Sequence, residues 1–320
     1  MMSEQINLTE LPYRSRHSLD LDVVRLADGT PLRLPVNIVI GRADGPCLVL
    51  VAGVHGDESE GVLALMELWS ELDPNSFKGR VVLVPVANPP AFAAHRRTSP
   101  LDGLDLNRIF PGKPDGSPSE RLAHRLFDSV LRHCDFLFSL HSWYSAGVVL
   151  PYVEFKHNIG TARASLEAAK ASGFDLIRIS EWSPGLMTRV VNEAGIPGME
   201  AEIGGTGISI PENRALYKAR ARALMGHLGM AASAQPMNPA RLVDHIDLMA
   251  PDGGVLMIST RIGAEIAAGE KLAQISDLHN RPLAEVRSPS QGLVGAMRLA
   301  GSVQAGELVF RIFRDISLDI

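Results

Sequence analysis

A histidine and a glutamate stand close together where a strongly apolar stretch of the chain ends. The segment LVLVAGVHGDESEG, residues 48–61, passes from five apolar residues to His55 and Glu58, with glycines on either side. Side chains three positions apart can face one point within a helical turn, and an imidazole nitrogen with a carboxylate oxygen makes half of a zinc site. Alone the pair is a weak signal, because short motifs often occur by chance and acidic residues also favour helix N-termini.

A second histidine strengthens this interpretation. The apolar segment FLFSLHSW ends in His141, again at the carboxyl end of a predicted strand, where the sites of α/β proteins form. Two histidines and one glutamate leave a fourth zinc position open for water, an arrangement typical of catalytic zinc. We therefore predict that His55, Glu58 and His141 bind one Zn²⁺ ion per chain.

Two further segments carry polar residues suited to such a site. The long loop HRRTSPLDGLDLNRIFPG, residues 95–112, contains arginines and an asparagine, and guanidinium groups bind carboxylates through paired hydrogen bonds. The short strand GMEAEIGG ends at Glu202 before two glycines. Because side chains alternate along a strand, Glu200 points to the same face as Glu202. Glu200 is therefore the rival candidate for the glutamate that projects into the site.

In this order, His55-x-x-Glu58, Asn107-Arg108, His141 and Glu202-Ile-Gly-Gly resemble the succinylglutamate desuccinylase/aspartoacylase family, which is related to the zinc carboxypeptidases. The resemblance covers nearly the whole chain. It implies a zinc-dependent amidohydrolase that acts on N-acyl amino acids or similar small amides.

The same resemblance implies roles for individual residues. Glu202 would be the general base that activates water and then protonates the leaving amine. Arg97 would polarise the scissile carbonyl, and Asn107 and Arg108 would hold the substrate carboxylate. The expected substrate is therefore a small molecule that carries a carboxylate.

The chain departs from the family pattern in two places. Relatives that use a tyrosine of the C-terminal domain at the substrate have no counterpart here, since the last tyrosine is Tyr217. Trp143 and Tyr144 follow His141 where many deacylases have a small glycine-rich segment, so they either reshape the pocket or are ordinary core aromatics. The acyl group and the amino acid stay open.

Three functions remain after these observations. The first is a zinc-dependent deacylase of small N-acyl amino acids or amides, for which an ester is also a possible substrate. The second is a zinc carboxypeptidase of short peptides, which a pocket open to a peptide chain would favour. The third is a non-catalytic zinc-binding or ligand-binding relative, against which the presence of Glu202 beside all three ligands speaks.

The elements expected to position these residues alternate between strands and helices. Alternation of this kind predicts an α/β fold, with a mixed sheet covered by helices on both faces, as in the zinc carboxypeptidases. Strands are predicted within 19–40 and at 48–53, 79–88, 135–141 and 198–204, and helices at 58–72, 117–134, 161–172, 185–194 and 211–230.

The composition changes near residues 231–240, and short strand-like runs with glycines follow. IAAGEKLAQI, residues 266–275, is repeated as VQAGELVFRI, residues 303–312. We predict a catalytic domain over 1–235 and a small all-β domain over 236–320. The latter resembles the biotinyl/lipoyl carrier scaffold, but its hairpin SDLHNRPL lacks the lysine that a carrier would modify.

Composition excludes several classes of protein. The chain has 320 residues, 46% of them hydrophobic, and a net charge of −5 without charge runs, which argues against nucleic acid as a partner. Cys47 and Cys134 are the two cysteines, and they suggest a reducing compartment. The N-terminus lacks the pattern of a signal peptide and no apolar run is long enough for a membrane span, so we expect a cytoplasmic protein, with association into homo-oligomers left open.

Overall fold

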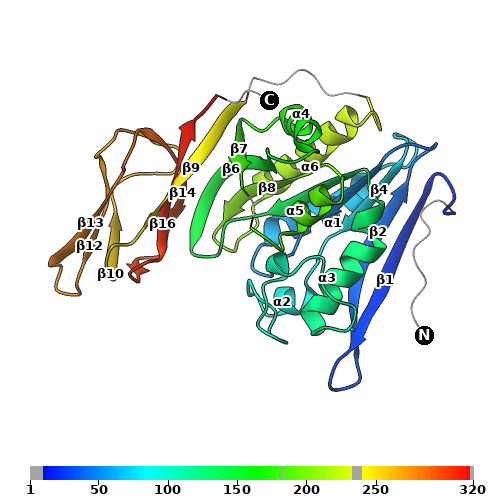
Figure 1. Cartoon of the computed structure of the whole chain (residues 1–320), viewed down its shortest axis with the longest axis horizontal. Coiled ribbons are helices and arrows are strands. Elements are labelled where there is room, and N and C mark those ends of the chain that lie inside the picture. The colour runs from blue at the N-terminus through cyan, green and yellow to red at the C-terminus, as the bar shows by residue number, and fades with distance from the viewer. Residues whose placement is uncertain (1–9, 182, 233–239, 318–320) are drawn as a thin grey trace.

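A twelve-stranded mixed sheet runs through most of the molecule (Figure 1). The computed structural model describes residues 10–181, 183–232 and 240–317. The strands follow the order β1-β2-β4-β3-β5-β8-β6-β7-β9-β16-β14-β11 across the sheet, and β6 also pairs with β14. In chain order these strands are β1 (Ser15–Arg25), β2 (Pro31–Ile40), β3 (Cys47–Val51), β4 (Arg80–Val84), β5 (Phe136–His141), β6 (Gly147–Lys156), β7 (Leu176–Ser180), β8 (Gly198–Gly205), β9 (Arg241–Met249), β11 (Glu265–Ile266), β14 (Gly292–Arg298) and β16 (Leu308–Asp315).

Helices cover both faces of this sheet, which confirms the predicted α/β class. Apolar residues of α1, α4 and α6 join one core with the sheet, and those of α3 and α5 join a second core on the opposite face. The α-helices are α1 (Ser59–Glu71), α2 (Pro89–Ala93), α3 (Pro118–Ser129), α4 (Ala162–Ser172), α5 (Met187–Glu193) and α6 (Pro211–His227), with 3₁₀ turns at Leu106–Arg108 and Leu131–His133.

The strands and helices that carry the predicted motifs form as expected. Every residue of β3 is buried, because helices lie against both faces of the strand. Ser117 and Glu120 form a capping box at the start of α3. On α1, Leu68 is fully buried against the sheet, whereas Met66 is 52% exposed. The sequence analysis also missed β6 and β7.

The C-terminal strands build a second sheet and also extend the first. The second sheet has the order β13-β12-β10-β15, formed by β10 (Gly254–Ile258), β12 (Lys271–Ser276), β13 (Pro282–Arg287) and β15 (Ser302–Val303). β9 continues the large sheet by pairing in parallel with β7. The division into two domains stays a proposal, and its boundary at 235/236 lies outside the described residues.

The internal repeat corresponds to two copies of one structural unit. In each copy a two-residue strand, β11 or β15, leads through a tight turn into a longer strand, β12 or β16. Gly269 and Gly306 occupy the same turn position with a φ of 81° in both, a conformation that favours glycine. Each copy contributes one strand to each sheet. β11 and β16 pair with β14 in the large sheet, whereas β15 and β12 pair with β10 in the small sheet.

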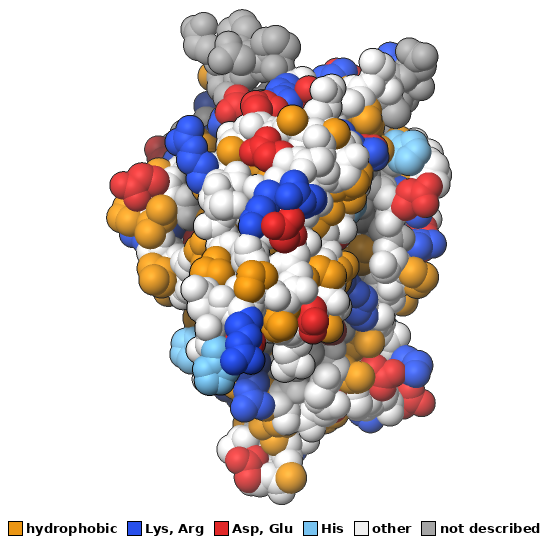
Figure 2. All heavy atoms as spheres, turned by 90° about the vertical axis from the view of Figure 1, so that its left-hand side faces the viewer, with side chains coloured by type: hydrophobic (Ala, Val, Ile, Leu, Met, Phe, Trp, Pro, Cys, Tyr) orange, Lys and Arg blue, Asp and Glu red, His pale blue; other side chains and the backbone are white. Residues whose placement is uncertain are grey.

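Figure 2 looks onto the side of the molecule on the left of Figure 1, where the C-terminal strands lie. Lysine and arginine side chains alternate there with aspartate and glutamate and with scattered apolar residues. Such a mixed surface differs from the clustered basic patch that nucleic-acid binding requires. Among the described residues, none of the helices has the length and apolar character required to cross a bilayer.

Candidate active site

The loop after β3 holds His55 through backbone contacts with the neighbouring β4–α2 segment. Asn88 N–H donates to the carbonyl of Gly53 at 2.9 Å, and Gly56 N–H donates to the carbonyl of Arg96 at 2.9 Å. A Cβ atom at Gly56 would lie 2.0 Å from the backbone of Ala91, so only glycine fits this approach. Close packing of two loops therefore fixes the position of His55.

Glu58 occupies the N-cap of α1 without capping the helix. Its side chain makes no capping hydrogen bond and turns toward the two histidines instead. Ser142 N–H donates to Glu58 Oε2 at 3.2 Å, which ties the carboxylate to the residue after β5. The helix N-terminus favours a negative charge at this position.

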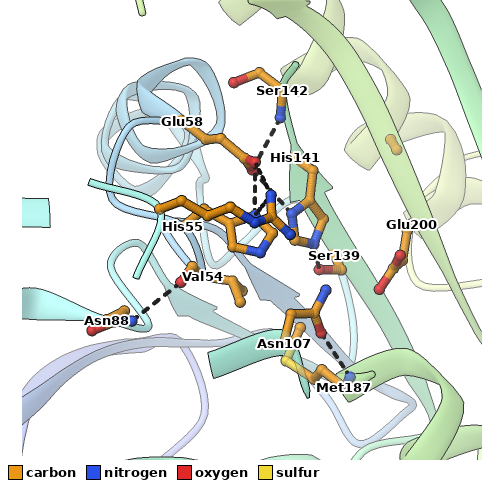
Figure 3. Close-up of polar contacts among 12 residues, drawn as sticks. Val54, His55, Glu58, Asn88, Asn107, Ser139, His141, Ser142, Met187 and Glu200 are labelled. Carbon is orange, nitrogen blue, oxygen red and sulfur yellow. Dashed lines mark hydrogen bonds and ion pairs between the residues drawn. The ribbon is translucent and has the colours of Figure 1, made fainter. Parts of the chain in front are cut away.

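The three predicted ligands converge in one buried cluster (Figure 3). Glu58 Oε1 lies 2.7 Å from His55 Nδ1, and Glu58 Oε2 lies 3.0 Å from His141 Nδ1. One ligand atom from each residue lies within 4.8 Å of the others, and each residue is less than 5% exposed. Two imidazole nitrogens and a carboxylate oxygen at these separations form a candidate metal site whose donor set suits zinc.

Neighbouring residues orient both imidazoles. Ser139 Oγ lies 2.8 Å from His141 Nε2, and Asp105 Oδ1 lies 3.3 Å from His55 Nε2. Each ring therefore presents Nδ1 to the centre, and a polar group lies beside Nε2, hydrogen-bonded in His141 and at ion-pair distance in His55. The hydroxyl of Tyr217 donates to the backbone carbonyl of His141 and fixes the end of β5.

Electrostatics within the cluster favour charged groups despite burial. Burial opposes protonation of His141, but Glu58 outweighs it and raises the pKa of His141 to about 9. Burial likewise opposes ionisation of Glu58, yet His55 and His141 hold the pKa of that carboxyl far below its usual range. Without a metal, the histidine protons therefore supply the positive charge that the buried carboxylate requires.

Zinc affinity should consequently rise with pH. Because the pKa of His141 is raised, its imidazole carries a proton at neutral pH, and a metal must displace that proton. Between about pH 6 and pH 8 we expect the zinc association constant to increase roughly tenfold per pH unit for each proton displaced. Competition titration against a chelating dye measures this dependence, and an affinity independent of pH would contradict the protonated apo site.

Strand register separates Glu202 from Glu200. On the neighbouring strand β8, Glu202 is the Cα partner of His141, and Glu200 is the partner of Ser139, two residues earlier along both strands. Glu202 Oε2 is buried without a hydrogen-bond partner among the described residues, whereas Glu200 Oε1 accepts from Thr188 Oγ1 at 2.9 Å. Burial, with Glu58 nearby, raises the pKa of Glu202 to about 8.

The predicted substrate-binding residues also reach this region. Arg97 Nε donates to Asp105 Oδ2 at 3.0 Å, and Arg97 Nη1 lies 3.8 Å from Glu58 Oε1. Asn107 is buried and accepts from Met187 N–H at 2.8 Å, whereas Arg108 is exposed and donates to the carbonyl of Asn107. Arg97, Asn107 and Arg108 all line the same cavity as the three candidate ligands.

This cavity measures about 400 Å³, and several of the residues that line it were not predicted from the sequence. Strands β6 and β7 contribute Glu154 and Arg178, and the C-terminal strands close one side. These strands supply His245, Leu308 and Arg311 to the lining. Trp143 and Tyr144 line the cavity too, and the guanidinium of Arg311 lies 5.0 Å from the Trp143 ring centroid.

Comparison with known proteins identifies the family. The profile of the succinylglutamate desuccinylase/aspartoacylase catalytic domain matches residues 44–227, which is more than half of the chain. The chain belongs to this family. A curated relative, the N-alpha-acetyl-L-2,4-diaminobutyric acid deacetylase of Halomonas elongata, is 32% identical over 289 residues, covering 86% of this chain and 84% of the relative.

Two solved structures share the whole architecture of this chain. The product-bound ectoine utilization protein EutE (DoeB) of Ruegeria pomeroyi has a TM-score of 0.87 at 27% identity, covering 95% of this chain and 97% of that one. A succinylglutamate desuccinylase/aspartoacylase of Rhodobacter sphaeroides has a TM-score of 0.87 at 26% identity, covering 96% and 98%. The chain is thus a deacylase of this family, with a candidate His–Glu–His metal site.

Proposed function

We propose that the chain is a zinc-dependent deacylase that hydrolyses the amide bond of a small N-acylated amino acid, with Glu202 as general base. The observation that carries this proposal is the position of Glu202. It is the strand partner of His141, and its buried Oε2 atom has no hydrogen-bond partner among the described residues. A water in the reaction position would supply the missing donor.

Different residues of the chain have different roles in hydrolysis. A bound zinc ion supplies a Lewis acid and makes hydroxide available near neutral pH, because it lowers the pKa of water toward ~7. Glu202 takes a proton from the water that adds to the carbonyl carbon, and returns it to the nitrogen as the C–N bond breaks. Asp105 holds Arg97 where its guanidinium would donate to the carbonyl oxygen, and such contacts stabilise a developing oxyanion by roughly a few kcal/mol.

The walls of the cavity support a small substrate over a peptide. The C-terminal strands close one side of the cavity with His245, Leu308 and Arg311. A carboxypeptidase would require that side to admit a peptide chain. Asn107 and Arg108 in the same cavity would hold the substrate carboxylate. The named activity of the Halomonas elongata relative supports an acetylated diamino acid as the specific substrate.

Mass spectrometry of one reaction tests this function. Zinc-loaded protein is incubated with a pool of acetylated amino acids, which includes Nα-acetyl-2,4-diaminobutyrate, and short peptides, with and without a chelator. We expect one or a few acetylated amino acids to be split only in the absence of the chelator. Shortening of the peptides alone from the C-terminus would instead identify a carboxypeptidase.

A further inference from the structure

Three charged residues on adjacent strands form one wall of the catalytic cavity. Glu200 on β8 is the Cα partner of Glu154 on β6, and Glu154 is in turn the partner of Arg178 on β7. All three line the cavity, and each is 5–6% exposed. Because partners in register point to the same face of a sheet, their side chains lie in a row beside the metal cluster. We refer to these three residues as the charged wall.

The charged wall carries one more carboxylate than it has cations. Arg178 forms an ion pair with Glu154, and two further arginines of the cavity, Arg311 and Arg97, are paired with Asp247 and Asp105. Glu200 accepts a hydrogen bond from the neutral hydroxyl of Thr188 and shares one with the carboxyl of Glu154, but no cation pairs with it among the described residues. A buried carboxylate without a counter-charge is costly.

Two observations favour the binding of a polar ligand at the charged wall. Arg178 Nε is buried and has no hydrogen-bond partner within the described part of the chain, although leaving a buried N–H unpaired is unfavourable. Burial raises the pKa of the Glu200 carboxyl, and the neighbouring Glu154 adds to this effect. A cation beside Glu200 would favour its ionised form, and an oxygen of the same ligand would satisfy Arg178.

We propose that the charged wall binds the amino-acid half of a monoacylated diamino acid, with the free second ammonium of the substrate against Glu200. This assignment rests on the proposed deacylase function and makes Glu200 a specificity residue instead of the base. The ammonium offers three donors and the missing positive charge. A substrate without the second amine leaves Glu200 without a cation, and loss of a hydrogen bond to a charged group lowers affinity by roughly 10- to 100-fold.

A matched pair of ligands tests this assignment. Calorimetry on the zinc-loaded protein compares 2,4-diaminobutyrate with 2-aminobutyrate, which lacks only the side-chain amine, and kcat/KM is compared for their Nα-acetyl derivatives. The wild-type protein should prefer the diamino compound by about 30-fold in both measurements. Glu200→Gln, which retains the acceptor for Thr188, should reduce this preference to about threefold or less, chiefly through Kd and KM.

Controls separate the charged wall from the deacylase function. Glu67→Gln removes a carboxylate on the outer face of α1, where Glu67 pairs with Arg214, and should preserve the preference. If Glu200→Gln does not fold, Glu200→Asp retains the charge at a shorter reach and should lower the preference partially. Equal affinity of the wild type for both compounds, or a preference that survives Glu200→Gln, overturns the assignment. If the protein binds the diamino compound more tightly but cleaves no acetylated substrate, the deacylase function is refuted and the assignment of the charged wall stands.

Discussion

Replacing Glu202 with glutamine should lower kcat by about 10³-fold, within the 10²–10⁴ range typical of a lost general base. Glutamine has the shape of glutamate but cannot take the proton of the attacking water. The candidate ligands His55, Glu58 and His141 are unchanged, so zinc content should stay near that of the wild type. Steady-state kinetics on the best acetylated substrate, with zinc measured by atomic absorption on the same sample, tests both parts.

The same measurement on Glu200→Gln decides between the two glutamates of β8. Its main effect should fall on KM and on substrate preference, because Glu200 is the strand partner of Ser139, two residues before His141. If Glu200→Gln lost about 10³-fold in kcat while Glu202→Gln retained activity, Glu200 would be the base and our assignment would be wrong.

Removing the candidate carboxylate ligand should weaken metal binding strongly and abolish activity. Glu58 contacts both histidines, at 2.7 Å and 3.0 Å, so Glu58→Ala removes the acid that joins the cluster. We expect zinc affinity to fall by about 10³-fold or more, since one of three protein ligands is lost from a site worth roughly 10 kcal/mol. Equilibrium dialysis with zinc and the rate of acetate release measure the two losses.

A milder variant provides the matched control. Ser139→Ala removes the partner of His141 Nε2 but leaves all three candidate ligands in place. Loss of an orienting residue of this kind typically costs about 10- to 100-fold in metal affinity or activity. Circular dichroism melts should show that both variants are folded. Full zinc content and full activity in Glu58→Ala would exclude the proposed centre.

The candidate metal cluster could be predicted from the sequence because its residues follow fully apolar strands. β3 and β5 are buried along their whole lengths, and His55 and His141 stand at the ends where parallel strands deliver polar groups to one edge. The choice between Glu200 and Glu202 required the structure. A strand period of two places both residues on one face, and only the register with β5 shows which one adjoins His141.

Other parts of the cavity depend on contacts that no local pattern encodes. β6 contains Pro151 and departs from regular alternation, so neither the strand nor Glu154 was predicted. Arg178, His245 and Arg311 reach the cavity from β7, β9 and β16, which become neighbours only when the large sheet forms. Asp105 could have been predicted from the sequence, because it lies two residues before Asn107 in the loop 95–112.

Titration of the metal-free protein with zinc, with acetate release from Nα-acetyl-2,4-diaminobutyrate followed after each addition, tests the central claim most directly. A single catalytic zinc bound by His55, Glu58 and His141 predicts that activity begins near zero, rises linearly and stops rising at one equivalent per chain. Full activity before any zinc is added, or zinc bound at one equivalent without hydrolysis of any acetylated amino acid, would contradict a zinc-dependent deacylase.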